Sequence, residues 1–223
     1  MSVAENLKNV QDTITKICGK YRRKASEVTL VAVSKRQSLA RIRACLEAGQ
    51  RVFGENIVQD AKRTWIDGGL REEYPDVRLH LIGALQSNKA KEAVAFFDCI
   101  ETVDRPKLVD ALKKEEQKQG LQREYFVQVN TGEELQKAGV TPDQLEDLLA
   151  YARDAGLRVT GLMCIPPMQE PAMLHFAFLR HLARRHGLEK LSMGMSEDFE
   201  KALAVSASHI RVGSAIFGPR DNG

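Results

Sequence analysis

Short, apolar, β-prone runs alternate with helical patterns along almost the whole chain, and this alternation restricts the possible folds more than any other feature. Each run is followed by a stretch in which apolar residues recur every three or four positions, as on one face of a helix. The candidate strands cover residues 28–34, 51–53, 78–83, 99–103, 124–130, 157–163, 190–193 and 209–213.

The first candidate strand is apolar on both faces. Val31 and Val33 lie on one face, and Leu30 and Ala32 lie on the other. A strand buried on both sides belongs to a parallel sheet that helices cover. Eight such strands in β-α alternation predict an α/β fold, a single (β/α)8 TIM-like barrel domain over residues 1–223. An open, doubly wound sheet is the alternative topology.

An extra helix is expected before the first strand. Its apolar residues, Val3, Leu7, Val10, Ile14 and Ile17, have helical spacing with polar residues between them. This amphipathic pattern differs from the continuous apolar core of a signal peptide. We expect the helix to cover one end or side of the barrel.

Helix start and stop signals follow several strands. Ser38 can cap a helix that Gly49 ends, and a second helix runs from Pro106 to Gly120. The segment Thr141-Pro-Asp-Gln144 has the pattern of a capping box.

Two further segments are predicted, one helical and one a surface connection. A long helix is expected over residues 173–186 and should end at Gly187. Residues 67–75 are interpreted as a surface connection.

Composition excludes several classes of function. The net charge is only +3, without the clustered basic face and interleaved aromatic residues of a nucleic-acid binder. No run of 18 apolar residues exists, so no membrane span is predicted. The four cysteines form no CxxC pair and are interpreted as reduced thiols of a cytoplasmic protein. The five histidines lack HxxxH or HExxH spacing, so no metal site is expected.

Lys35 is the first candidate functional residue. In a barrel of this kind, active sites lie at the carboxyl ends of the strands, and Lys35 ends the first apolar run. Apolar surroundings disfavour the charged amine, so the Lys35 pKa should fall and leave more of the neutral form that attacks a carbonyl. The alternative is a strand-end lysine that extends into solvent.

Two glycine-containing turns after the last two strands predict a phosphate site. Ser192-Met-Gly-Met-Ser196 precedes a helix expected to start near Ser196, and Val212-Gly213-Ser214 precedes another. The loops after strands 7 and 8 are the usual phosphate site of this fold. Alternatively, Ser196 only caps its helix and Gly213-Ser214 only turns the chain. Glu197 and Asp198 would repel a phosphate, so we expect them to face solvent.

Arg211 alternates with two apolar neighbours and should therefore point into the barrel. A buried guanidinium needs an acceptor. An aromatic ring nitrogen of a ligand could serve, or a carboxylate such as Glu55, or both.

Five segments together resemble the YggS/PROSC family of pyridoxal 5′-phosphate (PLP) proteins, and the resemblance extends over almost the whole chain. They are Val31-Ala-Val-Ser-Lys35, Phe53-Gly-Glu-Asn-Ile-Val-Gln59, His80-Leu-Ile-Gly-Ala-Leu-Gln-Ser-Asn-Lys89, Leu191-Ser-Met-Gly-Met-Ser196 and Arg211-Val-Gly-Ser-Ala-Ile-Phe-Gly218. A sixth, Gly161-Leu-Met-Cys-Ile165, is similar except that alanine is expected where Cys164 stands.

The resemblance implies a fold, a cofactor and roles for individual residues. The fold would be the barrel domain of alanine racemase without its second domain. Lys35 would carry PLP as an internal aldimine, Asn56 would lie near the ring, and Arg211 would face the pyridine nitrogen. Ser196, Gly213 and Ser214 would bind the phosphate. Members of the family are associated with PLP homeostasis and are commonly monomers, so apo-PLP enzymes are candidate recipients of the cofactor.

A carrier fits the residues better than an enzyme. An always-charged arginine at the ring nitrogen disfavours the protonated ring that acts as an electron sink. No tyrosine falls at the carboxyl end of a candidate strand, so no catalytic acid or base is assigned. Two alternatives remain: a PLP-dependent amino-acid racemase-like enzyme of low efficiency, and a Schiff-base aldolase-like barrel without PLP, for which Lys89 is the nearby second lysine.

Overall fold

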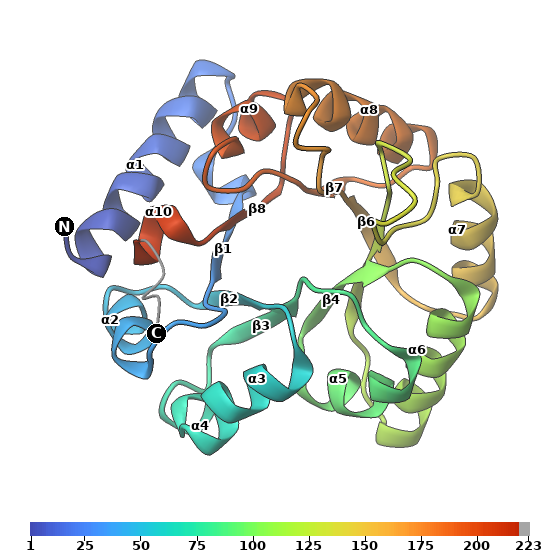
Figure 1. Ribbon diagram of the computed structural model, residues 1–223, viewed down its shortest axis with the longest axis horizontal. Coiled ribbons are helices and arrows are strands. Elements are labelled where there is room, and N and C mark those ends of the chain that lie inside the picture. The colour runs from blue at the N-terminus through green and yellow to red at the C-terminus, as the bar shows by residue number, and fades with distance from the viewer. Residues whose placement is uncertain (219–223) are drawn as a thin grey trace.

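A computed structural model describes residues 1–218, and all eight strands form one closed parallel barrel in chain order (Figure 1). The strands are β1 Thr29–Val33, β2 Val52–Glu55, β3 Arg78–Leu81, β4 Cys99–Val103, β5 Glu124–Gln128, β6 Val159–Met163, β7 Lys190–Ser192 and β8 His209–Val212. The predicted barrel is therefore confirmed, and the open sheet is excluded. The predicted domain of residues 1–223 includes 219–223, which lie outside the described residues.

Helices surround the barrel (Figure 1). They are α1 Val3–Lys20, α2 Leu39–Glu47, α3 Val58–Lys62, α4 Leu70–Glu73, α5 Ala90–Phe96, α6 Pro106–Gln119, α7 Leu145–Asp154, α8 Ala172–Arg185, α9 Phe199–Ala204 and α10 Ser214–Phe217. Short 3-10 turns cover Ala25–Glu27 and Ser87–Lys89, and a π turn covers Arg63–Asp67. None of the described helices is both long and apolar enough to cross a membrane.

The main hydrophobic core lies between the strands and the helices. Leu30 and Ala32 of β1 belong to it, together with the outward residues of the other strands. The barrel interior has a different composition. Cys99, Phe126 and Met163 form a small separate apolar cluster there. The period-two alternation of each strand thus separates a large outer core from a partly polar interior.

The extra N-terminal helix is confirmed as α1. Leu7, Val10 and Ile14 are buried on its inner face, and the helix packs against α2, α9 and α10 (Figure 1). Ser2 and Glu5 form a capping box at its start. In this way α1 covers the barrel where the first and last strands meet.

Several predicted boundaries are confirmed. Ser38 caps α2 by accepting a hydrogen bond from the Arg41 backbone N–H, and Gly49 follows this helix with a positive φ of 95°. Gly120 ends α6 in the left-handed conformation. Residues with a side chain rarely adopt these angles, which is why both signals could be read from the sequence.

One expectation about the connections was wrong, and another was incomplete. The Thr141–Gln144 capping box does not form, because residues 142–144 make a turn closed by the Gln144 backbone N–H on the Thr141 carbonyl. Regular helix begins only at Leu145, and its cap residue makes no side-chain capping bond. The connection 67–75 lies largely at the surface, as predicted, but it also contains the short helix α4, whose Leu70 is fully buried.

Candidate functional site

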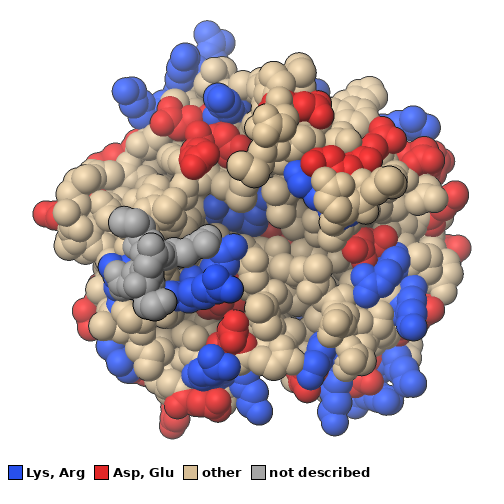
Figure 2. All heavy atoms as spheres, viewed as in Figure 1, with Lys and Arg blue, Asp and Glu red and all other residues tan. Residues whose placement is uncertain are grey.

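All the predicted site residues line one cavity of about 370 Å³ at the carboxyl ends of the strands: Lys35, Asn56, Ser196, Arg211, Gly213 and Ser214. Figure 2 shows lysine and arginine atoms in the hollow near the middle of the face seen in Figure 1. The volume lies within the range of roughly 300–1,000 Å³ usual for small-molecule sites. Residues from β1, β2, β7 and β8 and their loops thus meet at one place.

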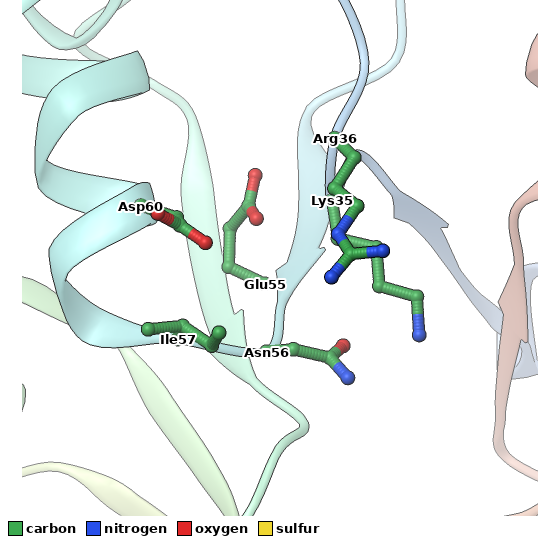
Figure 3. Close-up of a pocket in the computed structure, with 6 residues that line it drawn as sticks. All are labelled: Lys35, Arg36, Glu55, Asn56, Ile57 and Asp60. Carbon is green, nitrogen blue, oxygen red and sulfur yellow. The ribbon is translucent and has the colours of Figure 1, made fainter. Parts of the chain in front are cut away.

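Lys35 lies two residues beyond the end of β1, in a turn rather than on the strand itself. The Gln37 backbone N–H donates to the Ser34 carbonyl at 3.0 Å, and Arg36 has a positive φ of 58°. Lys35 is half-buried and also lines a second cavity of about 210 Å³ beside the first. In Figure 3 the side chains of Lys35 and Asn56 extend to the same side, away from Asp60 on α3.

Asn56 presents an unsatisfied polar atom at the cavity. Among the described residues its Oδ1 atom is buried and has no hydrogen-bond partner. Buried polar atoms are rarely left in this state without a functional reason. Gly83 allows the Asn56 backbone to approach closely, because a Cβ atom there would lie 2.1 Å from the Asn56 carbonyl oxygen. A ligand donor that reaches Oδ1 would satisfy it.

Ser196 does not cap a helix, contrary to one of the two sequence interpretations. Helix α9 begins at Phe199. The Ser196 hydroxyl oxygen instead accepts hydrogen bonds from the backbone N–H groups of Gly213 at 3.2 Å and Ala215 at 3.3 Å. The two glycine-containing loops are therefore joined at Ser196, with both facing the cavity.

Glu197 and Asp198 both line the cavity, so the expectation that they face solvent holds for the exposed Glu197 but not for the partly buried Asp198. Glu197 is exposed at the rim. Asp198 precedes α9, and its carboxylate accepts the Met195 backbone N–H at 2.6 Å. The hydrogen bond ties the Asp198 carboxylate to its own loop, where it turns the chain into α9.

Arg211 points into the barrel as expected and is only 3% exposed. Its guanidinium donates to the Ser192 hydroxyl at 2.6 Å and to the Cys164 carbonyl at 2.8 Å. Glu55, which was expected as a possible acceptor for Arg211, instead accepts hydrogen bonds from Ser34 at 2.6 Å and Trp65 at 3.1 Å. Burial raises the pKa of Glu55 despite these two hydrogen bonds.

Sequence reasoning missed a buried polar network below the cavity. Glu101 on β4 contacts Ser192 on β7 and His80 on β3, and His209 on β8 lies beside His80. The ligand atoms of His80, Cys99 and Glu101 lie within 4.8 Å of one another, a grouping that motif spacing along the chain cannot reveal. The strand parity of these residues could have shown that they point inward.

Neither the tyrosines nor Cys164 reaches the cavity. The residues that line it include no tyrosine, and Tyr125 is buried against Glu116 of α6. Cys164 contributes its carbonyl to Arg211, but its thiol is fully buried in the outer core. Burial raises the pKa of this thiol to about 12.

Comparison with known proteins shows relatives of full length. Residues 6–221 match the family model described as alanine racemase, N-terminal domain. The pyridoxal phosphate homeostasis protein of Pseudomonas aeruginosa is 38% identical, with 100% of this chain and 97% of that protein covered. The protein of the same name from Escherichia coli K12 is 34% identical, with 98% and 97% covered.

Solved structures agree with this relationship. PipY of Synechococcus elongatus without PLP is 35% identical with a TM-score of 0.84, and the comparison covers 97% of this chain and 100% of PipY. The PipY structure with PLP bound is 34% identical with a TM-score of 0.82 over the same shares. An alanine racemase of Clostridium difficile shares the fold at 8% identity and a TM-score of 0.72, and only 56% of that longer chain is covered.

Proposed function

Because the chain belongs to the family of pyridoxal phosphate homeostasis proteins, within the alanine racemase N-terminal domain family, we propose that it binds PLP and serves intracellular PLP homeostasis. In this proposal the cofactor is held as a Schiff base on Lys35. The observation that carries it is one cavity lined by Lys35 and by both loops suited to a phosphate. PLP needs both an amine for its aldehyde and a separate anion site.

The other cavity residues fit the chemistry of the cofactor. Ser196, Gly213 and Ser214 would hold the phosphate, because the two serine hydroxyls can donate to anionic oxygens and Gly213, which has no side chain, lets the phosphate approach the backbone closely. The buried, unpartnered Oδ1 of Asn56 would accept from a ligand donor near the ring. Arg211 uses two of its N–H groups on the protein and can donate another to the pyridine nitrogen.

Storage and delivery of PLP, rather than turnover, is the function these residues favour. PLP supplies an electron sink when bound, and a charged arginine beside the ring nitrogen weakens it by opposing protonation of that nitrogen. Among the residues that line the cavity, none is a tyrosine or histidine placed to move a proton at an α-carbon. Apo-PLP enzymes would be the recipients.

A racemase-like activity of low efficiency is the second candidate, and the fold shared with alanine racemase is the observation that favours it. Exchange of the α-proton of L-alanine in deuterated buffer, measured by NMR, separates the two. A carrier gives no exchange above that of free PLP. Exchange that requires Lys35 would support the enzyme.

We also propose that the protein is a cytoplasmic monomer built as one domain over residues 1–223. All four cysteines are unpaired and buried, which fits a reducing compartment. Light scattering of the purified protein with and without PLP tests the monomer.

The test of the main proposal is the absorbance spectrum of the purified protein with PLP. Wild type should give a Schiff-base band that Lys35→Ala lacks. Lys89→Ala is the matched control, because Lys89 lies on the loop after β3, outside the lining of the cavity. A wild type without a band would refute PLP binding through a lysine, and an equal band in Lys35→Ala would move the cofactor to another lysine.

A further inference from the structure

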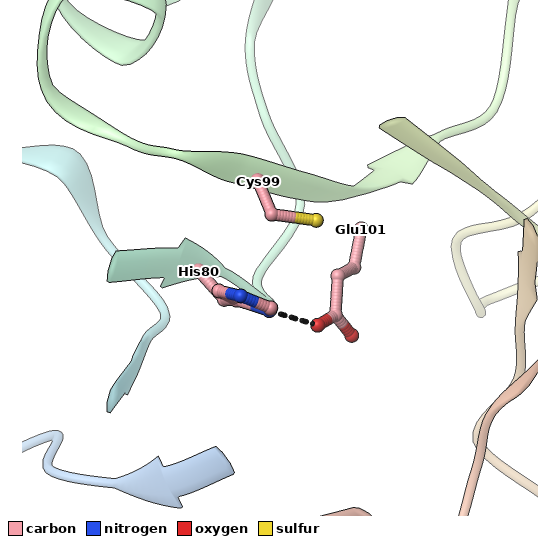
Figure 4. A group of neighbouring side chains, drawn as sticks. All are labelled: His80, Cys99 and Glu101. Atoms are coloured by element: carbon pink, nitrogen blue, oxygen red, sulfur yellow. Dashed lines mark hydrogen bonds and ion pairs between the residues drawn. The ribbon is translucent and has the colours of Figure 1, made fainter. Parts of the chain in front are cut away.

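Arg211 is the end of a chain of buried hydrogen bonds that crosses the barrel interior. Its guanidinium donates to Ser192 Oγ at 2.6 Å, and Ser192 Oγ donates to Glu101 Oε2 at 2.5 Å. The other oxygen, Glu101 Oε1, lies 2.7 Å from His80 Nδ1, as the dashed line in Figure 4 shows. These residues come from β8, β7, β4 and β3, and each is at most 3% exposed.

The direction of each hydrogen bond follows from the chemistry of the groups. A guanidinium only donates and a carboxylate only accepts, so Ser192 must give its proton to Glu101 and accept from Arg211. His80 must then donate to Glu101 from Nδ1. Every member has one orientation, and none can rotate without breaking a neighbour's bond.

Glu101 supplies the charge that the buried guanidinium requires. Burial alone would raise the pKa of Glu101, but its hydrogen bond with His80 and its electrostatic interactions with His80 and Arg211 lower the pKa to about 2. The carboxylate is therefore ionised at neutral pH. A buried arginine without a nearby negative charge would be strongly destabilising, and Ser192 places this charge one hydroxyl away.

The other end of this series of hydrogen bonds, at His80, reaches the amino-terminal end of the barrel. His80 lines a separate cavity of about 560 Å³ there, together with His209, Arg78, Glu124 and Lys190. His80, Cys99 and Glu101 also form the grouping that could hold a cation. Both oxygens of Glu101 already accept hydrogen bonds, so the network is satisfied by protein groups alone.

We propose that Glu101 is a positioning residue for Arg211, which it orients through Ser192 so that the remaining guanidinium donors face the ring nitrogen of PLP. The inference rests on the proposed PLP site. Two guanidinium bonds, to Ser192 and to the Cys164 carbonyl, fix the plane of the group. Loss of the Glu101 carboxylate removes the negative charge near the buried guanidinium and the fixed acceptor of the Ser192 proton, so Arg211 is no longer held in one orientation.

The test compares PLP with its 1-deaza analogue, in which a carbon replaces the ring nitrogen. Wild type should bind PLP about 10-fold more tightly, as expected for one hydrogen bond to a charged donor. Glu101→Gln and Ser192→Ala should reduce this preference to within about 2-fold. Ser192→Thr keeps the hydroxyl and should retain the preference.

Glu116→Gln is the control for loss of a buried carboxylate. Glu116 is 3% exposed but lies on α6, where it binds Tyr125 and Arg123 outside the barrel. If Glu101 had only a structural role, its substitution would weaken the binding of PLP and of the 1-deaza analogue equally and leave the preference for PLP unchanged. If Glu101→Gln does not fold, the Ser192→Ala and Ser192→Thr pair decides alone.

The outcomes separate the inference from the proposed function. If wild type forms a Lys35-dependent band but both variants keep the wild-type preference, Glu101 does not position Arg211 and PLP binding stands. A wild type with the band but no preference also overturns the inference, because Arg211 then does not contact the ring nitrogen. Absence of any Schiff-base band in wild type would instead overturn the proposed function.

Discussion

The hydroxyl oxygen of Ser196 lies 3.2 Å from the backbone nitrogen of Gly213 and accepts its hydrogen bond. This contact joins the loop after β7 to the loop after β8. Both loops line the cavity that also contains Lys35. A phosphate bound here would therefore meet a prearranged pair of loops rather than two independent segments.

Ser196→Ala should weaken PLP binding about 5- to 10-fold, the loss of roughly 1 kcal/mol for one hydrogen bond. Pyridoxal has the same aldehyde but no phosphate, so its binding should change by less than about 2-fold. Absorbance titration of the Schiff-base band measures both constants. Ser26→Ala, at an exposed serine, is the control. Equal weakening of both ligands would mean that Ser196 shapes the cavity without contacting the phosphate.

Substitution of two glycines near the site should have opposite consequences. A Cβ atom at Gly213 would lie 3.4 Å from Val33 Cβ, an ordinary contact, and the backbone there is not left-handed. Gly213→Ala should therefore change the free energy of unfolding by less than about 1 kcal/mol, yet weaken PLP binding, because Gly213 lines the cavity and a side chain there takes space beside the phosphate loops.

Gly194→Ala should mainly destabilise the fold. Gly194 has a φ of 93°, and a Cβ atom there would lie 2.6 Å from Ala202 Cβ. Strain and overpacking of this kind cost about 1–3 kcal/mol each. Urea unfolding of both variants without ligand measures the difference. A Gly213→Ala variant as unstable as Gly194→Ala would contradict this division of roles.

The sequence predicted the barrel well because each strand carries its own signal. The run that contains Val31 is apolar on both faces, which by itself predicts a strand of a covered parallel sheet, and Gly120 ends its helix through its own backbone freedom. The candidate site followed from one general property of the fold, namely that strand carboxyl ends meet. Lys35, Asn56 and Arg211 could therefore be placed at one cavity from their positions alone.

The errors arose where two distant segments decide the structure together. Ser196 resembles a helix cap, but its hydroxyl is used by Gly213 and Ala215, which no local pattern reveals. Glu101 accepts a hydrogen bond from Ser192, which lies 91 positions later in the sequence. Parity could show that Glu101 points inward, but strand register across the closed barrel determines which partner it meets.

Cys164→Ala should leave PLP binding within about 2-fold of wild type, although the thiol lies close to the site in sequence. The residue contributes its backbone carbonyl to Arg211, which alanine also provides. Burial raises the pKa of the thiol to about 12, so it should also resist alkylation in the folded protein. Iodoacetamide labelling with mass spectrometry should find Cys164 modified only in denaturant. Rapid labelling of the native protein would show that this part of the core opens.

His209 should make the fold sensitive to mild acid. Burial lowers the pKa of His209 to about 4, and the charges of Glu101, His80, Glu124 and Lys190 around it adjust this value without reversing it. In the unfolded chain a histidine titrates near 6.5. Between these two pKa values His209 binds a proton in the unfolded chain but not in the folded protein. The free energy of unfolding therefore falls as the pH decreases.

The contribution of neutral His209 to the free energy of unfolding is therefore fully present above about pH 6.5 and is lost as the pH falls toward 4. The loss is about 2 kcal/mol at pH 5. Urea unfolding at pH 7 and pH 5 should show this loss in wild type and a smaller loss in His209→Gln. His181→Gln is the control, because His181 is exposed on α8 and should behave as wild type. The quantity compared is the difference between the free energies of unfolding of one variant at pH 7 and pH 5. A destabilisation by the substitution that does not depend on pH therefore cancels. If the free energy of unfolding fell equally between pH 7 and pH 5 in His209→Gln and wild type, His209 would not be the group responsible.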